Sequence, residues 1–387
     1  LTSESAELWK QAYDTFRDVL GAEHADTLVA MGGLAHIYWS LDRLDESIPL
    51  FEEIRTICRR VCGEDHPDTL QAMANLGTNY DSAGRVDEAI SLLEETLKRC
   101  QRKLGAEHAT TFLTMNNLAA AYMEAKRQDE ALSLREASFR VHKKTLGPEH
   151  PDTLLSMGNL AAAYLAMDRM DQGLPLIEDS VRLAKKKLGL DHPATLPATC
   201  WLAEAYVKAG RPGEALQVLE EAVRSFKEKW GPENHYVIRP LNQLACTCWE
   251  LRRFDRSIPL FEEVLKLQKK VTGEDGPQTL GIMANLGQNY TDSGRLDEAI
   301  ELLEDTLKGC QQNLPPEHPT TLLATNNLSV AYQRKGCHEQ ALPLWEELLR
   351  VRTKVLGPEH PETLQCMFAV ALAYCHLKQF ERSIPLF

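Results

Sequence analysis

Histidines recur at one position of the chain, and they are the first candidates for chemistry. They follow a 42-residue spacing as His24, His66, His108, His150, His192, His318 and His360. One ring every 42 residues is too sparse to share a metal ion, whose bonds to imidazole are about 2.0 Å long. Asn234 and Gly276 would also break a ladder of ligands or pH sensors twice. We therefore predict no metal site, and expect these rings to pack and to hydrogen-bond the linker between helices.

The cysteines and the known catalytic motifs do not indicate an active site. Cys58 and Cys62 share a helix face but have no second pair nearby in the sequence. Cys246 and Cys248 are two residues apart, so on a helix they point in roughly opposite directions. The sequence contains no GxSxG, HExxH, P-loop or GxGxxG motif. We interpret the cysteines as small buried thiols of a cytoplasmic protein, and we expect no enzyme activity and no cofactor.

The charge balance and the absence of a long apolar stretch exclude nucleic acids and membranes as partners. The 387 residues include 43 Lys and Arg against 56 Asp and Glu, a formal net charge of −13. Nucleic-acid binding needs a basic face, and no Lys/Arg-rich run supplies one. No apolar stretch approaches the length of about 18 residues that a membrane span needs. The opening LTSESAELWKQ is not a signal peptide, and because it lacks Met we expect a fragment of a longer protein.

The elements that position these residues follow an internal repeat. The phrase LGAEHADTL, which starts at Leu20, returns in variants at intervals of 42 residues through nine copies, without insertion or deletion. Residues 61–104 and 271–314 share 29 of 44 positions at an offset of 210, whereas 61–104 and 103–146 share 16. This difference indicates that a block of five repeats was copied. A repeat of this length decides the fold before any local feature does.

Each repeat encodes two helices. In the unit that begins at Thr69, the apolar or small residues have the spacing of one helix face: Leu70, Met73, Leu76, Gly77 and Tyr80. Gly84 and Arg85 interrupt this pattern, and Asp87 is the predicted N-cap of a second helix that runs to about Leu104. In the linker that follows, glycine is expected to stop helix B, proline to prevent its continuation and threonine to cap the next helix A.

These residues resemble the tetratricopeptide repeat. Leu76, Gly77, Tyr80, Ala89 and Leu93 match its pattern, in which a small residue lets helices A and B approach and an aromatic residue fills the gap. Ordinary members have about 34 residues per repeat. The 42-residue period with an LGxEHPxT linker resembles the kinesin light chain subtype. The resemblance implies an all-α fold, a right-handed superhelical solenoid of about nine antiparallel helix pairs.

We predict that residues 1–387 form a single solenoid, because neither helix can bury its apolar face alone and neighbouring repeats must stack. Residues 1–20 would be helix B of a truncated repeat, and residues 363–387 a truncated last repeat. The complete units are expected to start near residues 27, 69, 111, 153, 195, 237, 279 and 321.

Asparagines form the candidate binding site. In tetratricopeptide repeats helix A lines the concave wall, and the position before the motif leucine faces the groove. Here that position, or the one before it, holds Asn75, Asn116, Asn117, Asn159, Asn242, Asn285, Asn326 and Asn327. An amide can pair with both the N–H and the C=O of an extended peptide, and the resemblance implies that these residues hold such a ligand. Alternatively, each asparagine bonds the adjacent helix A and sets the pitch of the superhelix.

We therefore expect a protein-interaction scaffold that binds an extended peptide or a helical segment of a partner protein in the concave groove. Nearby Trp39, Trp249, Lys208, Arg239 and Arg334 would select the side chains of the ligand. The groove positions of helix A are mostly uncharged, which disfavours a clamp for a C-terminal carboxylate and favours a neutral or mildly basic ligand for the first five repeats.

Two other function classes can be weighed against this one. The chain could be the sensor or regulatory arm of a larger signalling enzyme, such as a kinase, NTPase or protease. Its effector or catalytic domain would then lie elsewhere on the same longer chain, since both ends stop within a repeat. An RNA reader built from helical pairs would have a shorter repeat and a basic groove, and this sequence has neither.

Overall fold

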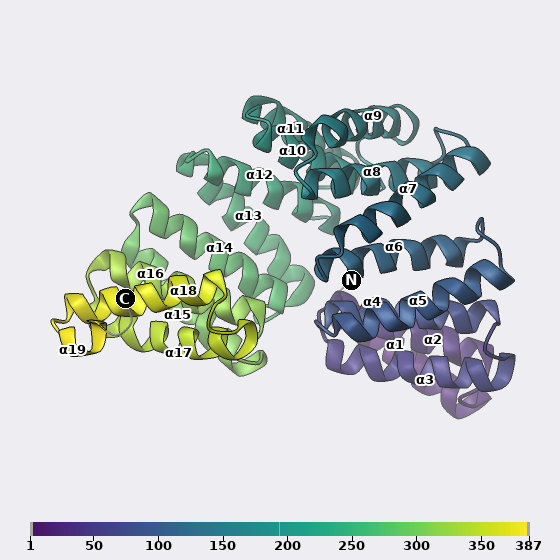
Figure 1. Ribbon diagram of the computed structural model, residues 1–387, viewed down its shortest axis with the longest axis horizontal. Coiled ribbons are helices and arrows are strands. Elements are labelled where there is room, and N and C mark those ends of the chain that lie inside the picture. Colours follow the sequence, from purple (N-terminus) through teal and green to yellow (C-terminus); the bar gives the residue numbers. More distant parts are fainter. Residues whose placement is uncertain (1–2, 193, 385–387) are drawn as a thin grey trace. The chain divides into compact units, whose positions relative to one another are not determined.

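The helices follow the sequence repeat. In the computed structural model, which describes residues 3–192 and 194–384, each 42-residue repeat contains two successive helices, A and B (Figure 1). The described residues form helices and turns and contain no strand, so the predicted all-α fold is confirmed. Within the same residues, every helix is too short or too polar to cross a membrane.

The first compact unit comprises Leu1–Pro240. Its A helices are α2 (Ala25–Ser40), α4 (Pro67–Ser82), α6 (Ala109–Glu124), α8 (Pro151–Ala166) and α10 (Leu196–Lys208). Its B helices are α1 (Ser3–Leu20), α3 (Leu44–Cys62), α5 (Val86–Lys103), α7 (Gln128–Thr145), α9 (Met170–Leu188) and α11 (Pro212–Trp230). The short helix η1 (His235–Val237) leads into α12 (Ile238–Glu250), where the division between the units falls.

The second compact unit comprises Leu241–Phe387. After α12 it contains α13 (Phe254–Thr272), α14 (Pro277–Ser293), α15 (Leu296–Asn313), α16 (Pro319–Lys335), α17 (His338–Leu356), α18 (Pro361–His376) and α19 (Phe380–Ser383). The A helices α2, α4 and α6 start two residues before the predicted unit starts near 27, 69 and 111. The organisation of residues 1–387 as a single solenoid stays a prediction.

Histidine side chains fix the linkers. At all seven repeat positions, Nδ1 of the histidine accepts a hydrogen bond of 3.2–3.3 Å from the backbone N–H two residues later, as His66 does from Asp68. Asn234 makes the equivalent bond to Tyr236 through Oδ1 at 3.0 Å. The N–H groups at the start of a helix have no partner within the helix, so these bonds satisfy one of them in each repeat. The expected structural role of the histidines is confirmed.

Two predicted caps were wrong. Thr69 does not cap helix α4, because His66 occupies the N-cap position and the Thr69 hydroxyl donates backward to the carbonyl of Gly63 at 2.8 Å. Gly63 has φ of +95°, a conformation that only glycine adopts readily. Asp87 lies inside the first turn of α5, whose N-cap is Arg85, so its charge favours the helix through the dipole instead.

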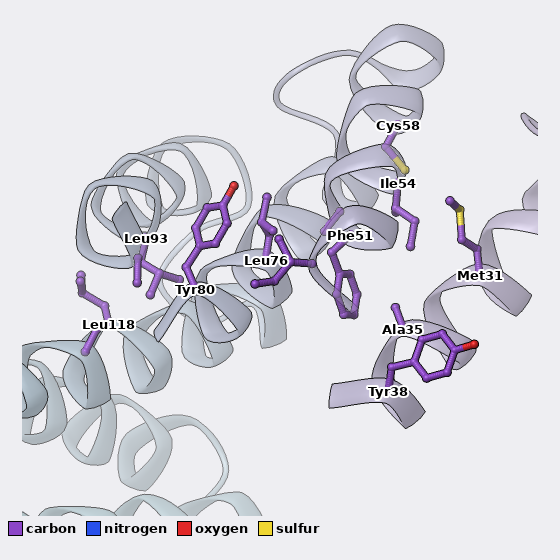
Figure 2. Close-up of a cluster of buried hydrophobic side chains, with 14 of the residues drawn as sticks. Met31, Ala35, Tyr38, Phe51, Ile54, Cys58, Leu76, Tyr80, Leu93 and Leu118 are labelled. Carbon is purple, nitrogen blue, oxygen red and sulfur yellow. The ribbon is translucent and has the colours of Figure 1, made fainter. Parts of the chain in front are cut away.

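The core lies between the helices of neighbouring repeats. A Cβ on Gly77 of α4 would lie 2.5 Å from Cγ of Leu93 on α5, so helices A and B touch here through a glycine, as the sequence predicts. Leu93 is fully buried. Figure 2 shows part of this apolar cluster, to which the successive helices from α2 to α6 contribute side chains such as Phe51 and Leu118. The A helices are thereby held in fixed register, which positions their polar side chains.

Candidate functional site

All eight predicted asparagines lie on A helices. Four belong to the first unit, on α4, α6 and α8, and four to the second, on α12, α14 and α16. Seven are half-buried, while Asn327 is only 4% exposed. Each unit therefore presents its own group of asparagines on its A helices.

Asn117 and Asn327 bond the preceding helix A. Nδ2 of Asn117 donates to the carbonyl of Ala74 at 3.2 Å, and Nδ2 of Asn327 donates to that of Ala284 at 3.0 Å. The two contacts are the same contact in two copies, 210 residues apart. Both bonds agree with the alternative interpretation, in which an asparagine bonds the adjacent helix A and sets the pitch of the superhelix. Peptide contact by the asparagines stays a prediction.

The other asparagines have different surroundings. Nε2 of Gln71 donates to Oδ1 of Asn75 at 3.2 Å, and Nδ2 of Asn326 lies 3.4 Å from Oδ1 of Asn327. Oδ1 of Asn242 is buried and has no hydrogen-bond partner among the described residues. The backbone carbonyl of Asn159 accepts from Nη1 of Arg135 at 3.0 Å, and its side chain is half-buried. These amides therefore differ in how much hydrogen-bonding capacity they retain for a ligand.

Three side chains that are expected to select the ligand connect neighbouring A helices. Nε1 of Trp39 donates to Oγ of Ser82 at 2.9 Å. Nε1 of Trp249 donates to Oδ2 of Asp292 at 3.0 Å, and Arg334 forms an ion pair with the same carboxylate at 2.9 Å. Contact of these three side chains with a ligand stays a prediction.

A pocket of about 340 Å³ opens on the A-helix face of the first unit. Its lining combines Met123 of α6, Asn159 of α8, and Trp201 and Lys208 of α10 with Arg135 of helix B α7. This volume lies at the lower end of the range of about 300–1,000 Å³ for ligand pockets. The sequence predicted Asn159 and Lys208 here but missed Arg135, which only a comparison of the same position across repeats reveals.

A second residue that the sequence missed is Asp81 on α4. Burial first, and then the negative charge of Glu124 on α6, raise the pKa of its carboxyl group to about 6. Oδ1 of Asp81 is buried without a hydrogen-bond partner among the described residues. The signal in the sequence was a carboxylate directly after the motif tyrosine, where other repeats carry Trp39, Met123 or Leu165.

One group of potential metal-ligand atoms exists in the described part of the chain. Cys62, His66 and Asp68 each offer an atom within 4.8 Å of the others, and all three residues are exposed. Nδ1 of His66 already accepts the N–H of Asp68 in the helix cap. Because the ring is committed to the cap through this nitrogen, the cluster is accounted for as part of the linker.

Comparisons with known proteins agree with the repeat. The family model of the tetratricopeptide repeat matches residues 26–102, 110–169, 157–228, 231–312 and 320–387. No curated protein sequence matches this chain. A crystal structure of nearly identical TPR-like repeats, from a kinesin light chain-like protein of Podosopora anserina, is 29% identical with a TM-score of 0.48; the match covers 53% of this chain and 98% of that one.

Two further solved structures share the fold at lower identity. BtubC (BKLC) from P. vanneervenii is 22% identical with a TM-score of 0.51, covering 61% of this chain and 93% of that one. The apo form of the quorum sensor NprR from B. thuringiensis is 16% identical with a TM-score of 0.54, covering 91% and 96%. Helix pairs that touch through a glycine, a repeat without gaps and a family match over most of the sequence lead to one assignment: the chain belongs to the tetratricopeptide repeat family.

Proposed function

We propose that this chain is a protein-interaction scaffold whose A helices bind an extended peptide or a helical segment of a partner protein. Tetratricopeptide repeats generally mediate interactions between proteins. The observation that carries the proposal is Asn159, whose half-buried side-chain amide borders a pocket formed mainly by A helices. Such an amide can pair with a peptide N–H or C=O whatever the peptide side chains are.

The pocket supports this function by its composition. It joins an amide, two cationic groups and one carboxylate to the apolar surface of Trp201 and Met123, a mixture of apolar surface and a few polar groups that is typical of binding sites. Apart from Arg135 of helix B α7, the lining residues come from three successive A helices of one unit, so a ligand seated there would lie across several repeats. A peptide that follows the A helices would meet one repeat after another.

The test begins with selection of random dodecapeptides displayed on phage against the whole chain. Selected peptides are then titrated calorimetrically with the wild type and with Asn159→Ala. We expect the substitution to weaken binding by about 1–3 kcal/mol, the cost of one lost buried hydrogen bond, while the melting temperature is unchanged.

Asn117→Ala is the matched control. Its amide already donates to the carbonyl of Ala74, so we expect this variant to lose stability and to retain most of the binding. Selection of no peptide, or undiminished binding by Asn159→Ala, would overturn the proposal.

A further inference from the structure

Arg135 stands where the other repeats bury an apolar side chain. The same position holds Phe51, Leu93, Ile177, Leu219, Phe261, Leu303 and Trp345, each no more than 5% exposed. These residues fill the space between helix A and helix B. Among these eight equivalent residues only Arg135 is charged. The seven apolar counterparts show that packing of helices A and B favours an apolar side chain at this position.

The guanidinium of Arg135 is only partly satisfied. One nitrogen, Nη1, donates to the backbone carbonyl of Asn159 at 3.0 Å. The Nε–H is buried and has no hydrogen-bond partner among the described residues. Burial of the side chain lowers the pKa of Arg135. A charged group is costly to bury in a position that otherwise holds apolar side chains, and departures from a local rule of this kind concentrate at functional sites.

The surroundings of Arg135 suit an anion that carries an apolar stem. Arg135 lines the same pocket as Lys208, so two positive groups border one space of about 340 Å³. Glu204 also lines the pocket, so the lining carries two positive groups and one negative group. Trp201 supplies an aromatic surface against which methylene groups can pack. Arginine is also the residue best suited to bidentate contact with a carboxylate.

We infer that this pocket binds the carboxylate of an aspartate or glutamate side chain of the partner, with Arg135 as its counter-ion. Lys208 adds a second positive charge, and Trp201 covers the stem of the bound side chain. The inference rests on the proposed function for the source of the carboxylate, a peptide. It replaces the expectation of a neutral or mildly basic ligand at this place, because that expectation considered helix A alone and the decisive cation comes from helix B.

The test uses small probes, so that it does not depend on a peptide being found. The chain is labelled with 5-fluorotryptophan, and Trp201→Phe identifies the resonance of Trp201 among the six tryptophans. N-acetyl-glutamate N-methylamide is titrated against the neutral N-acetyl-glutamine N-methylamide. We expect the glutamate probe to shift the Trp201 signal saturably and the glutamine probe to bind about tenfold or more weakly, because it lacks the charge-assisted contact.

Two variants at Arg135 separate binding from packing. Arg135→Gln removes the charge and keeps a donor for the carbonyl of Asn159, and we expect it to abolish the preference for the glutamate probe. Arg135→Leu restores the residue type of the other repeats, and we expect it to lose the probe and to melt at a higher temperature than the wild type. Arg140→Leu, which removes an exposed charge from the same helix, should leave probe binding unchanged.

The outcomes decide between the two proposals. Equal shifts with both probes, or a preference for glutamate that survives in Arg135→Gln, would overturn the carboxylate site. If Arg135→Leu instead melts at a lower temperature and the probes do not discriminate, Arg135 only supports the fold. A glutamate preference without any selected peptide would keep the carboxylate site and contradict the scaffold function. If peptides are selected but the probes show no preference for glutamate, the scaffold function is supported and the carboxylate site is contradicted.

Discussion

The hydroxyl of Tyr122 donates a 2.8 Å hydrogen bond to Oε1 of Glu94, a residue of helix B in the preceding repeat. The same bond over the same 28-residue interval recurs from Tyr80 to Glu52 and from Tyr164 to Glu136. This hydrogen bond links consecutive repeats. From the sequence, the motif tyrosine is expected only to fill the gap between helices A and B. In a stacked array, stability depends on such contacts between neighbours.

Tyr122→Phe should lower the stability of the chain by about 1 kcal/mol, because it removes one hydrogen bond and keeps the ring. Tyr122→Ala, which also removes a buried ring, should cost about 3–5 kcal/mol. Tyr38→Phe is the matched control, since the residue 28 positions earlier is Lys10 and not a glutamate. Urea unfolding followed by circular dichroism measures all three. Equal losses for Tyr122→Phe and Tyr38→Phe would contradict the role of the bond.

The tyrosines should also make the fold sensitive to alkali. Burial, and next the hydrogen bond to Glu94, raise the pKa of Tyr122 to about 12, and the pKa values of Tyr206, Tyr290 and Tyr332 are raised to about 12 in the same way. In the unfolded chain a tyrosine ionises near pH 10, approximately. Because the folded pKa is the higher one, this contribution to stability is complete below the unfolded pKa and is lost as the pH rises toward 12.

The measurement is the absorbance of phenolate at 295 nm during an alkaline titration. We expect a fraction of the tyrosines to ionise later in the folded chain than in the chain unfolded with guanidinium. Tyr122→Phe should reduce the amplitude of that late fraction. Superimposable titrations of the folded and unfolded chain would rule this prediction out.

Asp81→Asn should stabilise the chain at neutral pH. The folded pKa of Asp81, about 6, lies above its unfolded value, so the carboxyl favours folding when protonated and opposes it as the pH rises through 6. After allowance for its partial exposure, the gain from the substitution should be about 1–2 kcal/mol at pH 7.5. Thermal melts at pH 7.5 and pH 4 should show a difference only at the higher pH. A gain of the same size at both pH values would mean that charge is not the cause.

His66→Ala should cost about 1 kcal/mol through the loss of an N-cap. His66→Asn should restore most of it, because Asn234 already caps a helix of this chain through Oδ1. Chemical denaturation of the two variants against the wild type gives the comparison. If both variants lose equally, ring packing rather than the hydrogen bond stabilises the linker.

Sequence patterns were sufficient for the helix pairs but not for every residue at their ends. The close approach of α4 to α5 could be predicted because the position of Gly77 holds a small residue in every repeat, as Ala119 and Ala161 illustrate. The cap residue could not, since threonine is a common N-cap and only the backbone geometry shows that Thr69 bonds backward to Gly63. When a side chain has several possible hydrogen-bond partners, the three-dimensional course of the backbone decides which one it meets. The local sequence does not contain that information.

The candidate site was predictable to a smaller extent. The positions of the asparagines on helix A follow from the repeat, but their partners depend on the distance to the next helix A, as the bond from Asn117 to Ala74 illustrates. Arg135 was missed for a different reason. A single arginine in a charged helix is unremarkable along the sequence, and it becomes informative only beside Leu93 and Ile177 at the same position of the neighbouring repeats.

The two copies of the five-repeat block now differ where the pocket lies. They keep the same internal bonds, such as those of Asn117 and Asn327, yet the copy has Trp345 in place of Arg135 and Ala369 in place of Asn159. The blocks are thus internal paralogues within one polypeptide. A property that depends on Arg135 and Asn159 is therefore expected in the first unit and not in the second, which carries Trp345 and Ala369 at these positions. The second block thus serves as an internal control for the pocket of the first, in the same molecule and under the same conditions.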